Sequence, residues 1–221
     1  DEALQGWFGE GKLKGKGIAL LKPTTFMNLS GQAASATMQR LSLGNTSVLC
    51  AVDEIQLDTG RLKLSSGGSD GGHNGLTSMI AELGDNDFRR MRLGVGPYRK
   101  EEAPDGLKGF VLSKFRADEA ELLKATLELG CQVLEEWMVE GADDAGFVKA
   151  TSFGNAKSRQ PKELLEKSPE PQSEPEPKPA TEGLPQGAPE VAERQIAHVP
   201  YESKGLAIWQ TLKALFGAKR K

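Results

Sequence analysis

His73 and Asn74 are side chains that can form hydrogen bonds, and the imidazole can also move protons. They follow a run of glycine, serine and aspartate at residues 67–72. Glycine lets backbone N–H groups approach a ligand closely. The apolar residues that come next recur with helical spacing: Leu76, Met79, Ile80 and Leu83. The first turn of a helix presents free N–H donors and a partial positive charge, which suit a phosphate or an oxyanion. We therefore predict a ligand site at the start of this helix; the alternative is a flexible turn with a polar N-cap.

Asp53 is the candidate for a working carboxylate. It follows the apolar run 47–52, which is typical of a central strand covered on both sides. Open α/β sheets bind ligands just past the carboxyl ends of such strands, and a carboxylate there can orient a histidine or bind a donor. The neighbouring Glu54 points to the opposite side of a strand, so we assign it to a solvated turn.

The loop 24–30 supplies a third candidate, Asn28. An asparagine in a loop is more often a cap or turn residue, and Phe26 beside it is more often a core residue than a stacking surface. Asn28 or Ser30 is predicted to cap the following helix, residues 32–41.

The stretch GGSDG at residues 67–71 also matches G-x-S-x-G, in which a serine nucleophile stands on a sharp turn between a strand and a helix. Such a serine, here Ser69, needs a histidine base within reach. The chain has two histidines. His198 falls in a proline-rich segment, and His73 shares the turn with Ser69 without an obvious elbow geometry. A serine hydrolase is therefore an alternative. The G-x-G-x-x-G and Walker A patterns do not occur.

Alternating strand and helix patterns predict an α/β fold with a mixed or parallel sheet. Strand patterns occupy residues 17–21, 47–52, 61–64 and 91–95, and helical patterns occupy residues 32–41, 76–83 and 119–140, with one or two further turns at 143–150.

The net charge of −3 argues against a general nucleic-acid coat but allows a local basic patch. Two distant cysteines do not make a disulfide framework or a zinc site, and no apolar run has membrane-spanning length. We expect a reduced, cytoplasmic protein. Seven basic residues lie in or near the strands and loops that flank the glycine-rich turn. Individually each is expected to be a solvated surface charge, and together they could form a basic patch that binds phosphates: Arg61, Lys63, Arg89, Arg90, Arg92, Arg99 and Lys100.

Composition divides the chain into three parts. Residues 1–155 form the predicted domain. Residues 156–200 hold most of the chain's prolines among glutamate, serine and lysine, which predicts a disordered linker. Residues 201–221 form a basic amphipathic helix that could bind the ribosome, a membrane surface or another protein; the alternative is packing on the core or a spacer.

Five stretches carry a family resemblance, in this order: KPTTFMNLSG (22–31), VDEIQLDTGRLKL (52–64), GGSDGGHNGLTSMIAELG (67–84), FRRMRLGVG (88–96) and GFVLSKF (109–115). Together they resemble the bacterial peptidyl-tRNA hydrolase family. The resemblance implies one α/β domain with a twisted mixed sheet flanked by helices. It implies hydrolysis of the ester between a peptide and the 3′ end of tRNA, by a monomer that uses neither a metal nor an organic cofactor.

The resemblance also implies roles at matching positions. Phe26 and Asn28 resemble residues that contact the tRNA end and the peptide, and Asn74 resembles an asparagine that holds the substrate. Asp53 resembles the carboxylate that orients and stabilises the catalytic histidine. His73 resembles a histidine that assists binding and is not the base.

The family pattern begins with a buried strand and a segment carrying an asparagine and the catalytic histidine, and neither occurs in this sequence. The resemblance implies that the chain as given is truncated before its first strand and its general base. We expect little or no hydrolysis by this polypeptide. Binding of the tRNA end without catalysis is the second alternative.

Overall fold

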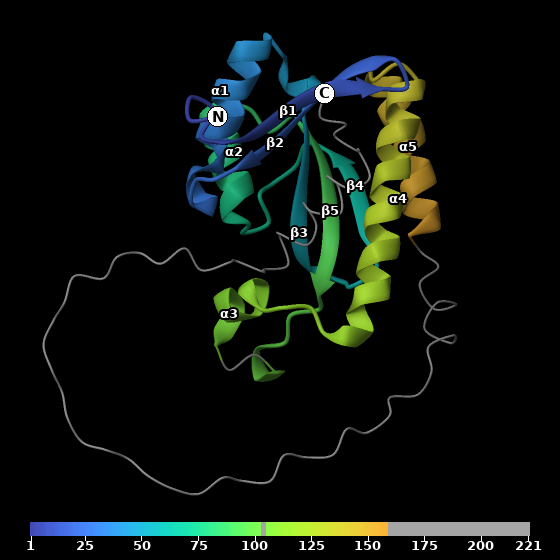
Figure 1. Ribbon diagram of the computed structural model, residues 1–221. Helices are drawn as coiled ribbons and strands as arrows, with labels where there is room; N and C mark the ends of the chain where they lie inside the picture. The colour runs from blue at the N-terminus through green and yellow to red at the C-terminus, as the bar shows by residue number, and fades with distance from the viewer. Residues whose placement is uncertain (103–104, 159–221) are drawn as a thin grey trace, which may run out of the picture.

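The computed structural model describes residues 1–102 and 105–158 (Figure 1). The basic helix predicted at residues 201–221 lies outside the described residues, as does the predicted linker from residue 159 onward. The described chain ends in a helix that runs to Lys157, so the folded part extends slightly past the boundary predicted at residue 155.

The described residues form five strands and five α-helices. The strands are β1 (Gly6–Leu13), β2 (Lys16–Pro23), β3 (Leu49–Asp58), β4 (Leu62–Ser66) and β5 (Arg89–Gly96). The α-helices are α1 (Ser30–Leu41), α2 (Asn74–Leu83), α3 (Gly106–Leu112), α4 (Ala120–Val139) and α5 (Asp144–Lys157). Short 3₁₀ helices are η1 (Met27–Leu29), η2 (Asn45–Ser47), η3 (Lys100–Glu102) and η4 (Ala117–Glu119).

A mixed three-stranded sheet lies at the centre, in the order β3-β5-β4. β5 is parallel to β3 and antiparallel to β4, while β1 and β2 form a separate antiparallel ribbon. The predicted α/β fold with a mixed sheet flanked by helices is confirmed. The prediction that the strand after residue 47 is central is wrong, because β5 is the strand with neighbours on both sides within the described chain. It is buried along nearly its whole length.

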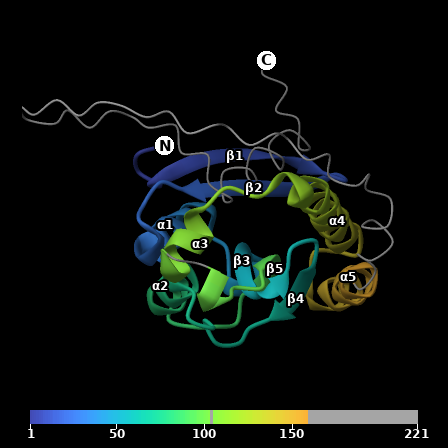
Figure 2. The ribbon, with the colours of Figure 1, turned by 90° about the horizontal axis from the view of Figure 1, so that it is seen from below.

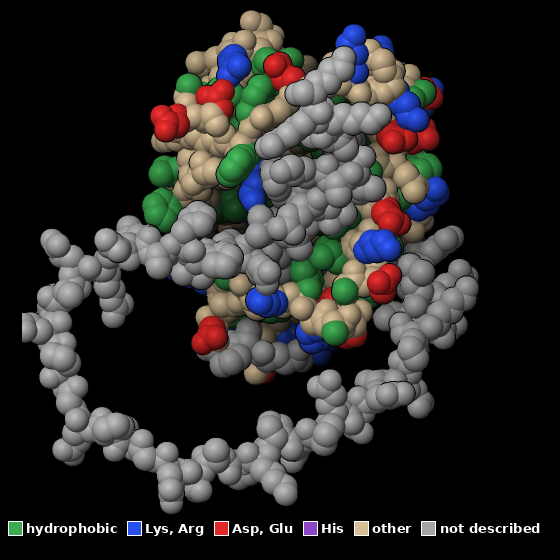
Figure 3. All heavy atoms as spheres, in the orientation of Figure 1, with side chains coloured by type: hydrophobic (Ala, Val, Ile, Leu, Met, Phe, Trp, Pro, Cys, Tyr) green, Lys and Arg blue, Asp and Glu red, His purple; other side chains and the backbone are tan. Residues whose placement is uncertain are grey.

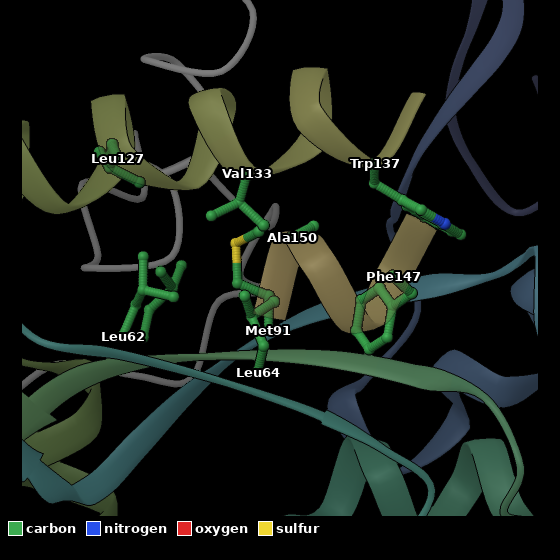
Figure 4. Packing of buried hydrophobic residues seen from close by; sticks show 9 residues of the cluster. Leu62, Leu64, Met91, Leu127, Val133, Trp137, Phe147 and Ala150 are labelled. Carbon is green, nitrogen blue, oxygen red and sulfur yellow. The ribbon is translucent and has the colours of Figure 1, made fainter. Parts of the chain in front are cut away.

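Helices cover the two faces of this sheet (Figure 2). α4 and α5 pack on one face over Leu62, Leu64 and Met91, and the core there is completed by side chains from both helices (Figure 4): Leu127, Val133, Trp137, Phe147 and Ala150. α1 and α2 lie on the other face, where Leu76 and Met79 pack on strand residues. Most of the folding energy of elements of this kind comes from such apolar burial. Packing on both faces therefore holds the sheet in place, and with it the residues at its strand ends and adjoining turns.

Several local predictions need correction. The N-cap of α1 is Leu29, without a side-chain bond, so neither Asn28 nor Ser30 caps it. η1 leads directly into the helix, and its backbone supplies the first hydrogen bond, from Leu29 N–H to the Phe26 carbonyl. β1 was not predicted, because its glycines break the apolar alternation on which strand prediction depends. α5 is longer than the one or two turns expected.

Within the described residues, every helix is too short or too polar to cross a lipid bilayer.

Candidate active site

The contact between Asp53 and His73 is the centre of the site. Asp53 lies in β3, and its carboxylate Oδ1 is 3.1 Å from His73 Nε2. Both side chains are largely withdrawn from solvent, at 23% and 13% exposure. His73 Nδ1 accepts hydrogen bonds from the backbone N–H groups of Gly75, at 3.1 Å, and Leu76, at 3.2 Å. Since Nδ1 is an acceptor, the ring proton is on Nε2 and is donated to Asp53.

His73 is therefore the N-cap of α2. An acceptor at this position satisfies the orphan N–H groups of the first helical turn, so an imidazole here does the work usually done by serine or aspartate. The next residue, Asn74, begins the helix and is exposed. The structure thus places an exposed amide directly beside an imidazole whose two nitrogens are both engaged.

Glycines shape the turn that delivers these residues. Gly67, Gly68, Gly71 and Gly72 all have positive φ, a region that side chains with a Cβ rarely adopt. Asp70 closes the turn: one carboxylate oxygen accepts from Gly72 N–H at 3.1 Å and the other accepts the Thr77 hydroxyl at 2.7 Å. The Asp70 carbonyl accepts from His73 N–H at 3.1 Å. Hydrogen bonds of its own residues therefore hold the turn together.

η1 brings Phe26 and Asn28 next to α2. Gly75 has room for Met27 only because it lacks a side chain: a Cβ on Gly75 would stand 2.6 Å from Met27 Sδ. Asn28 is the middle residue of η1 and is exposed. Phe26 is 81% exposed, so its assignment to the core is wrong. An aromatic ring and an amide are left at the surface beside the start of α2.

The second acid of β3 is also partnered. Glu54 Oε2 accepts from Arg92 Nη1 at 2.8 Å, and both side chains are mostly buried. The prediction of a solvated turn at Glu54 is wrong, because β3 continues pairing with β5 through both acids. The two acids point apart as the strand alternation requires.

Two members of the predicted basic patch are not at the surface. Arg89 and Arg90 are 3% and 0% exposed, so they are not solvated surface charges. On the face shown in Figure 3, Lys and Arg side chains are interspersed with Asp and Glu over the α4 side of the molecule. The Arg89 guanidinium lies against two aromatic rings and pairs with Asp144, while that of Arg90 donates to two backbone carbonyls beside the Phe88 ring. The sequence pattern does not reveal these contacts.

Asp70 makes the glycine-rich turn sensitive to acid. The Gly72 N–H first, and then the Thr77 hydroxyl, hold the pKa of the Asp70 carboxyl below its ordinary value. A carboxyl whose pKa is lowered on folding stabilises the fold above its unfolded pKa of about 4, and this contribution disappears as pH falls through the folded value. We expect Asp70→Asn to destabilise the protein at neutral pH and to match the wild type increasingly as the pH is lowered below about 4.

Urea unfolding of wild type and Asp70→Asn at a series of pH values measures this difference. Thr77→Val, which removes the second donor alone, should give a smaller pH-dependent difference in the same direction. A stability difference that is independent of pH would contradict this account of the turn.

A comparison with known proteins decides the family. The sequence model of the family described as Peptidyl-tRNA hydrolase matches residues 1–160. The chain belongs to the peptidyl-tRNA hydrolase family.

Curated relatives agree with this assignment. A peptidyl-tRNA hydrolase of Synechocystis sp. is 42% identical over 138 residues, which is 62% of this chain and 70% of the relative. One from Clostridium botulinum is 37% identical over 144 residues, covering 65% and 73%. The crystal structure of peptidyl-tRNA hydrolase from Acinetobacter baumannii superposes with a TM-score of 0.62 at 30% identity, covering 71% of this chain and 75% of that one. The family is that of hydrolases acting on the ester bond of peptidyl-tRNA.

For a member of the peptidyl-tRNA hydrolase family, the serine alternative has little structural support. Ser69 is not among the residues with positive φ that a strained elbow would require, and α2 begins only at Asn74. Both nitrogens of His73 are already engaged. The cysteines do not offer another nucleophile, because burial raises the pKa of the Cys50 and Cys131 thiols to about 11. A thiol with such a pKa is not a thiolate at neutral pH.

Sequence reasoning missed three contributors to the site. Met27 of η1 packs against Gly75 of α2, and Asp70 accepts a hydrogen bond within the glycine-rich turn. Arg90 of β5 donates to the Ser69 carbonyl of the same turn. The Asp70–Gly72 bond had a readable signal in the sequence, since aspartate in a turn favours bonding to the backbone two residues on. Within residues 1–102 and 105–158, no cluster of three or more His, Cys, Asp or Glu side chains could hold a metal ion.

Proposed function

We propose that Asp53, His73 and Asn74, with Phe26 and Asn28 of the neighbouring η1 segment, hold the acylated 3′ end of peptidyl-tRNA while its ester is hydrolysed. The supporting observation is the Asp53–His73 contact at the start of α2. It fixes an imidazole, and with it the first turn of the helix, beside the exposed amide of Asn74.

The chemistry of the surrounding side chains fits an ester carrying a nucleotide on one side and a peptide on the other. Ester hydrolysis needs donors for the developing oxyanion, and the amide of Asn74 can be such a donor. The exposed ring of Phe26 can stack on a base, a contact worth about 1–3 kcal/mol in single-stranded nucleic-acid sites. Asn28, exposed in η1, supplies a second amide near the start of α2.

The general base is a separate question. His73 Nε2 carries a proton donated to Asp53, and Nδ1 is occupied by two backbone donors. Taking a proton on Nδ1 would break the cap of α2. We therefore propose that His73 binds and positions, that Asp53 can orient an imidazole, and that no residue of the described chain is assigned as the base. On this proposal the 221-residue polypeptide binds the tRNA end with little or no hydrolysis.

An N-acetylated aminoacyl-tRNA tests the proposal, with deacylated tRNA as reference ligand. We expect the blocked, acylated tRNA to bind more tightly than deacylated tRNA. Asn74→Ala should weaken binding of the acylated tRNA by about fivefold, the equivalent of one hydrogen bond of about 1 kcal/mol. Asn45→Ala in η2, at the opposite end of β3, is the matched control and should change nothing.

Two outcomes would overturn parts of this proposal. Equal binding of acylated tRNA by the wild type, Asn74→Ala and Asn28→Ala would remove these residues from the site. Release of the labelled N-acetyl amino acid as fast as by a full-length homologue would show that the chain contains a base, and would refute the assignment of His73 to positioning alone.

The remaining partners stay predictions from the sequence. We propose that the chain acts in the cytoplasm, because its substrate arises in translation. That it acts as a monomer stays a prediction from the family resemblance. The ribosome, a membrane surface or another protein remains the predicted partner of residues 201–221, which lie outside the described residues.

A further inference from the structure

Arg90 is a fully buried cation in the central strand β5, with 0% exposure. It forms no ion pair with a carboxylate in the described part of the chain. Its Nη1 donates to the Ser69 carbonyl at 2.5 Å, its Nη2 donates to the Asn86 carbonyl at 3.1 Å, and its guanidinium lies 4.5 Å from the centre of the Phe88 ring. Burial and then the nearby Arg92 lower the pKa of this guanidinium.

Such a burial is expensive for the fold. A buried cation must be fully hydrogen-bonded to recover its lost hydration, yet Arg90 Nε is buried without a partner among the described residues. An apolar side chain of similar volume would pack here at lower cost. What the guanidinium does, and an apolar side chain could not do, is donate to two carbonyls at once. One of them belongs to the glycine-rich turn.

Ser69 lies in the middle of that turn, flanked by the glycines with positive φ. Glycine-rich backbone loses more conformational freedom on folding than any other, so the turn needs anchors to keep one shape. Gly67 N–H bonds to the Phe88 carbonyl at 3.1 Å and anchors the start. The Ser69 carbonyl is the next anchor to the sheet, and it is held by Arg90 and, at 3.2 Å, by Arg92 Nη2.

The two arginines are not equivalent. Arg92 is partly exposed and also held by Glu54, so it joins the turn to the residue next to Asp53. Arg90 is buried and makes the shorter bond. Its position is fixed by the core through Phe88, which is itself 1% exposed. Arg90 therefore transmits the rigidity of the sheet to the turn.

The connection from this anchor to the site is short. Ser69 is followed by Asp70, whose carbonyl accepts from His73 N–H. His73 then uses one ring nitrogen for Asp53 and the other for the start of α2. Both ring contacts depend on where the turn places His73, so we expect a shift of the turn to weaken them.

We propose that Arg90 is a positioning residue: by holding the Ser69 carbonyl it fixes the glycine-rich turn and keeps His73 in contact with Asp53 and Asn74 at the substrate. Arg90 touches neither the substrate nor the reacting atoms. The inference rests on the proposed function only for its consequence in tRNA binding; its structural part concerns the state of the His73 ring.

Arg89 provides a matched control. It is the adjacent residue of β5, nearly as buried, but it points to the other face between Trp137 and Phe147. Arg90→Met and Arg89→Met remove the same charge from the same strand. Only the first should affect the turn. Arg90→Lys keeps the charge but supplies a single ammonium in place of a planar fork, so we expect an intermediate effect.

The readout is the imidazole ¹⁵N spectrum of His73, recorded in the full chain with His198→Gln so that one imidazole remains. The wild type should show a single neutral form protonated on Nε2. Arg90→Met should lose this single form by exchange between tautomers, while Arg89→Met should keep it even if both variants melt at lower temperature. The Kd for N-acetylated aminoacyl-tRNA should rise about tenfold in Arg90→Met alone.

The outcomes separate the two proposals. A folded Arg90→Met or Arg90→Lys variant with the wild-type His73 spectrum would overturn the positioning role, as would the same spectral change in Arg89→Met. If Arg90→Met does not fold, Arg90→Lys decides. If the wild type does not bind the acylated tRNA, the proposed function fails, but the spectrum still tests Arg90.

Discussion

Replacement of Gly31 by alanine is expected to destabilise the protein by about 3 kcal/mol, as overpacking of a tight core does. A Cβ at this position would stand 2.2 Å from the Ser78 carbonyl oxygen and 2.5 Å from its carbon. These are backbone atoms inside α2, so they cannot rotate away. α1 must move off α2, and the buried bond from Gly31 N–H to Ser78 Oγ, now 2.9 Å, is lost with it.

The same displacement should reach the site. η1 leads directly into α1, so Phe26 and Asn28 move with the helix. Even under conditions in which the Gly31→Ala variant is folded, it should bind N-acetylated aminoacyl-tRNA less tightly than the wild type. This result would connect helix packing to recognition of the substrate end.

Gly44→Ala is the control for this substitution. Gly44 precedes η2, has a negative φ and has open space where a Cβ would be, so its replacement should change stability by less than about 0.5 kcal/mol. Urea unfolding of the two variants gives the comparison. Equal stability of Gly31→Ala and Gly44→Ala would show that the α1–α2 contact is not as close as described.

Elements with a clear apolar period were predictable from the sequence. The apolar stripe from Leu76 to Leu83 predicted α2. Gly84, with a φ of 67°, ends this helix in the left-handed conformation that glycine favours at helix C-termini. The fold class followed from the alternation of such elements. The glycine turn could be recognised as a site because glycine and polar residues occurred together, and the resemblance supplied roles for Asp53, His73 and Asn74 that remain predictions.

What could not be predicted depends on contacts between distant residues. Asp53 and His73 are 20 residues apart, and no local pattern says that a residue in a strand meets the cap of a helix. Arg90 was expected at the surface because arginine usually is. Its burial depends on Phe88 beneath it and on two carbonyls of a turn whose shape is itself a product of the fold. β3 was expected to stop before its acids, but His73 and Arg92 partner them and the strand continues.

Trp137 of α4 is part of the hydrophobic core between α4, α5 and the sheet. It is 5% exposed, its Nε1 donates to the Asp143 carbonyl at 3.0 Å, and its ring meets Phe147 edge-on at 5.5 Å. We expect Trp137→Ala to cost about 4 kcal/mol, the usual range for truncating a buried aromatic side chain. Val139→Ala, an exposed residue on the same helix, should cost less than about 0.5 kcal/mol.

Part of that cost should come from Arg89, and a double substitution can isolate it. The guanidinium carbon of Arg89 lies 4.9 Å from the Trp137 ring centre and 5.2 Å from that of Phe147. Within the part of the chain that the structure describes, its Nε and Nη1 are buried without hydrogen-bond partners, and its Nη2 contacts the exposed carboxylate of Asp144. The two aromatic rings therefore stabilise this buried cation, and a desolvated cation–π contact contributes about 2 kcal/mol.

Removal of the Trp137 ring should leave the buried Arg89 guanidinium with less compensation for its lost hydration. In the Trp137→Ala background, Arg89→Met should then cost less than it does in the wild type, or even stabilise the protein, because a buried charge without compensation is more costly than an apolar side chain. The double-mutant cycle in urea should give a coupling of about 1 kcal/mol or more. Strict additivity would mean that Arg89 owes its place to Asp144 and not to the aromatic pair, and Asp144→Asn would then be the more damaging partner substitution.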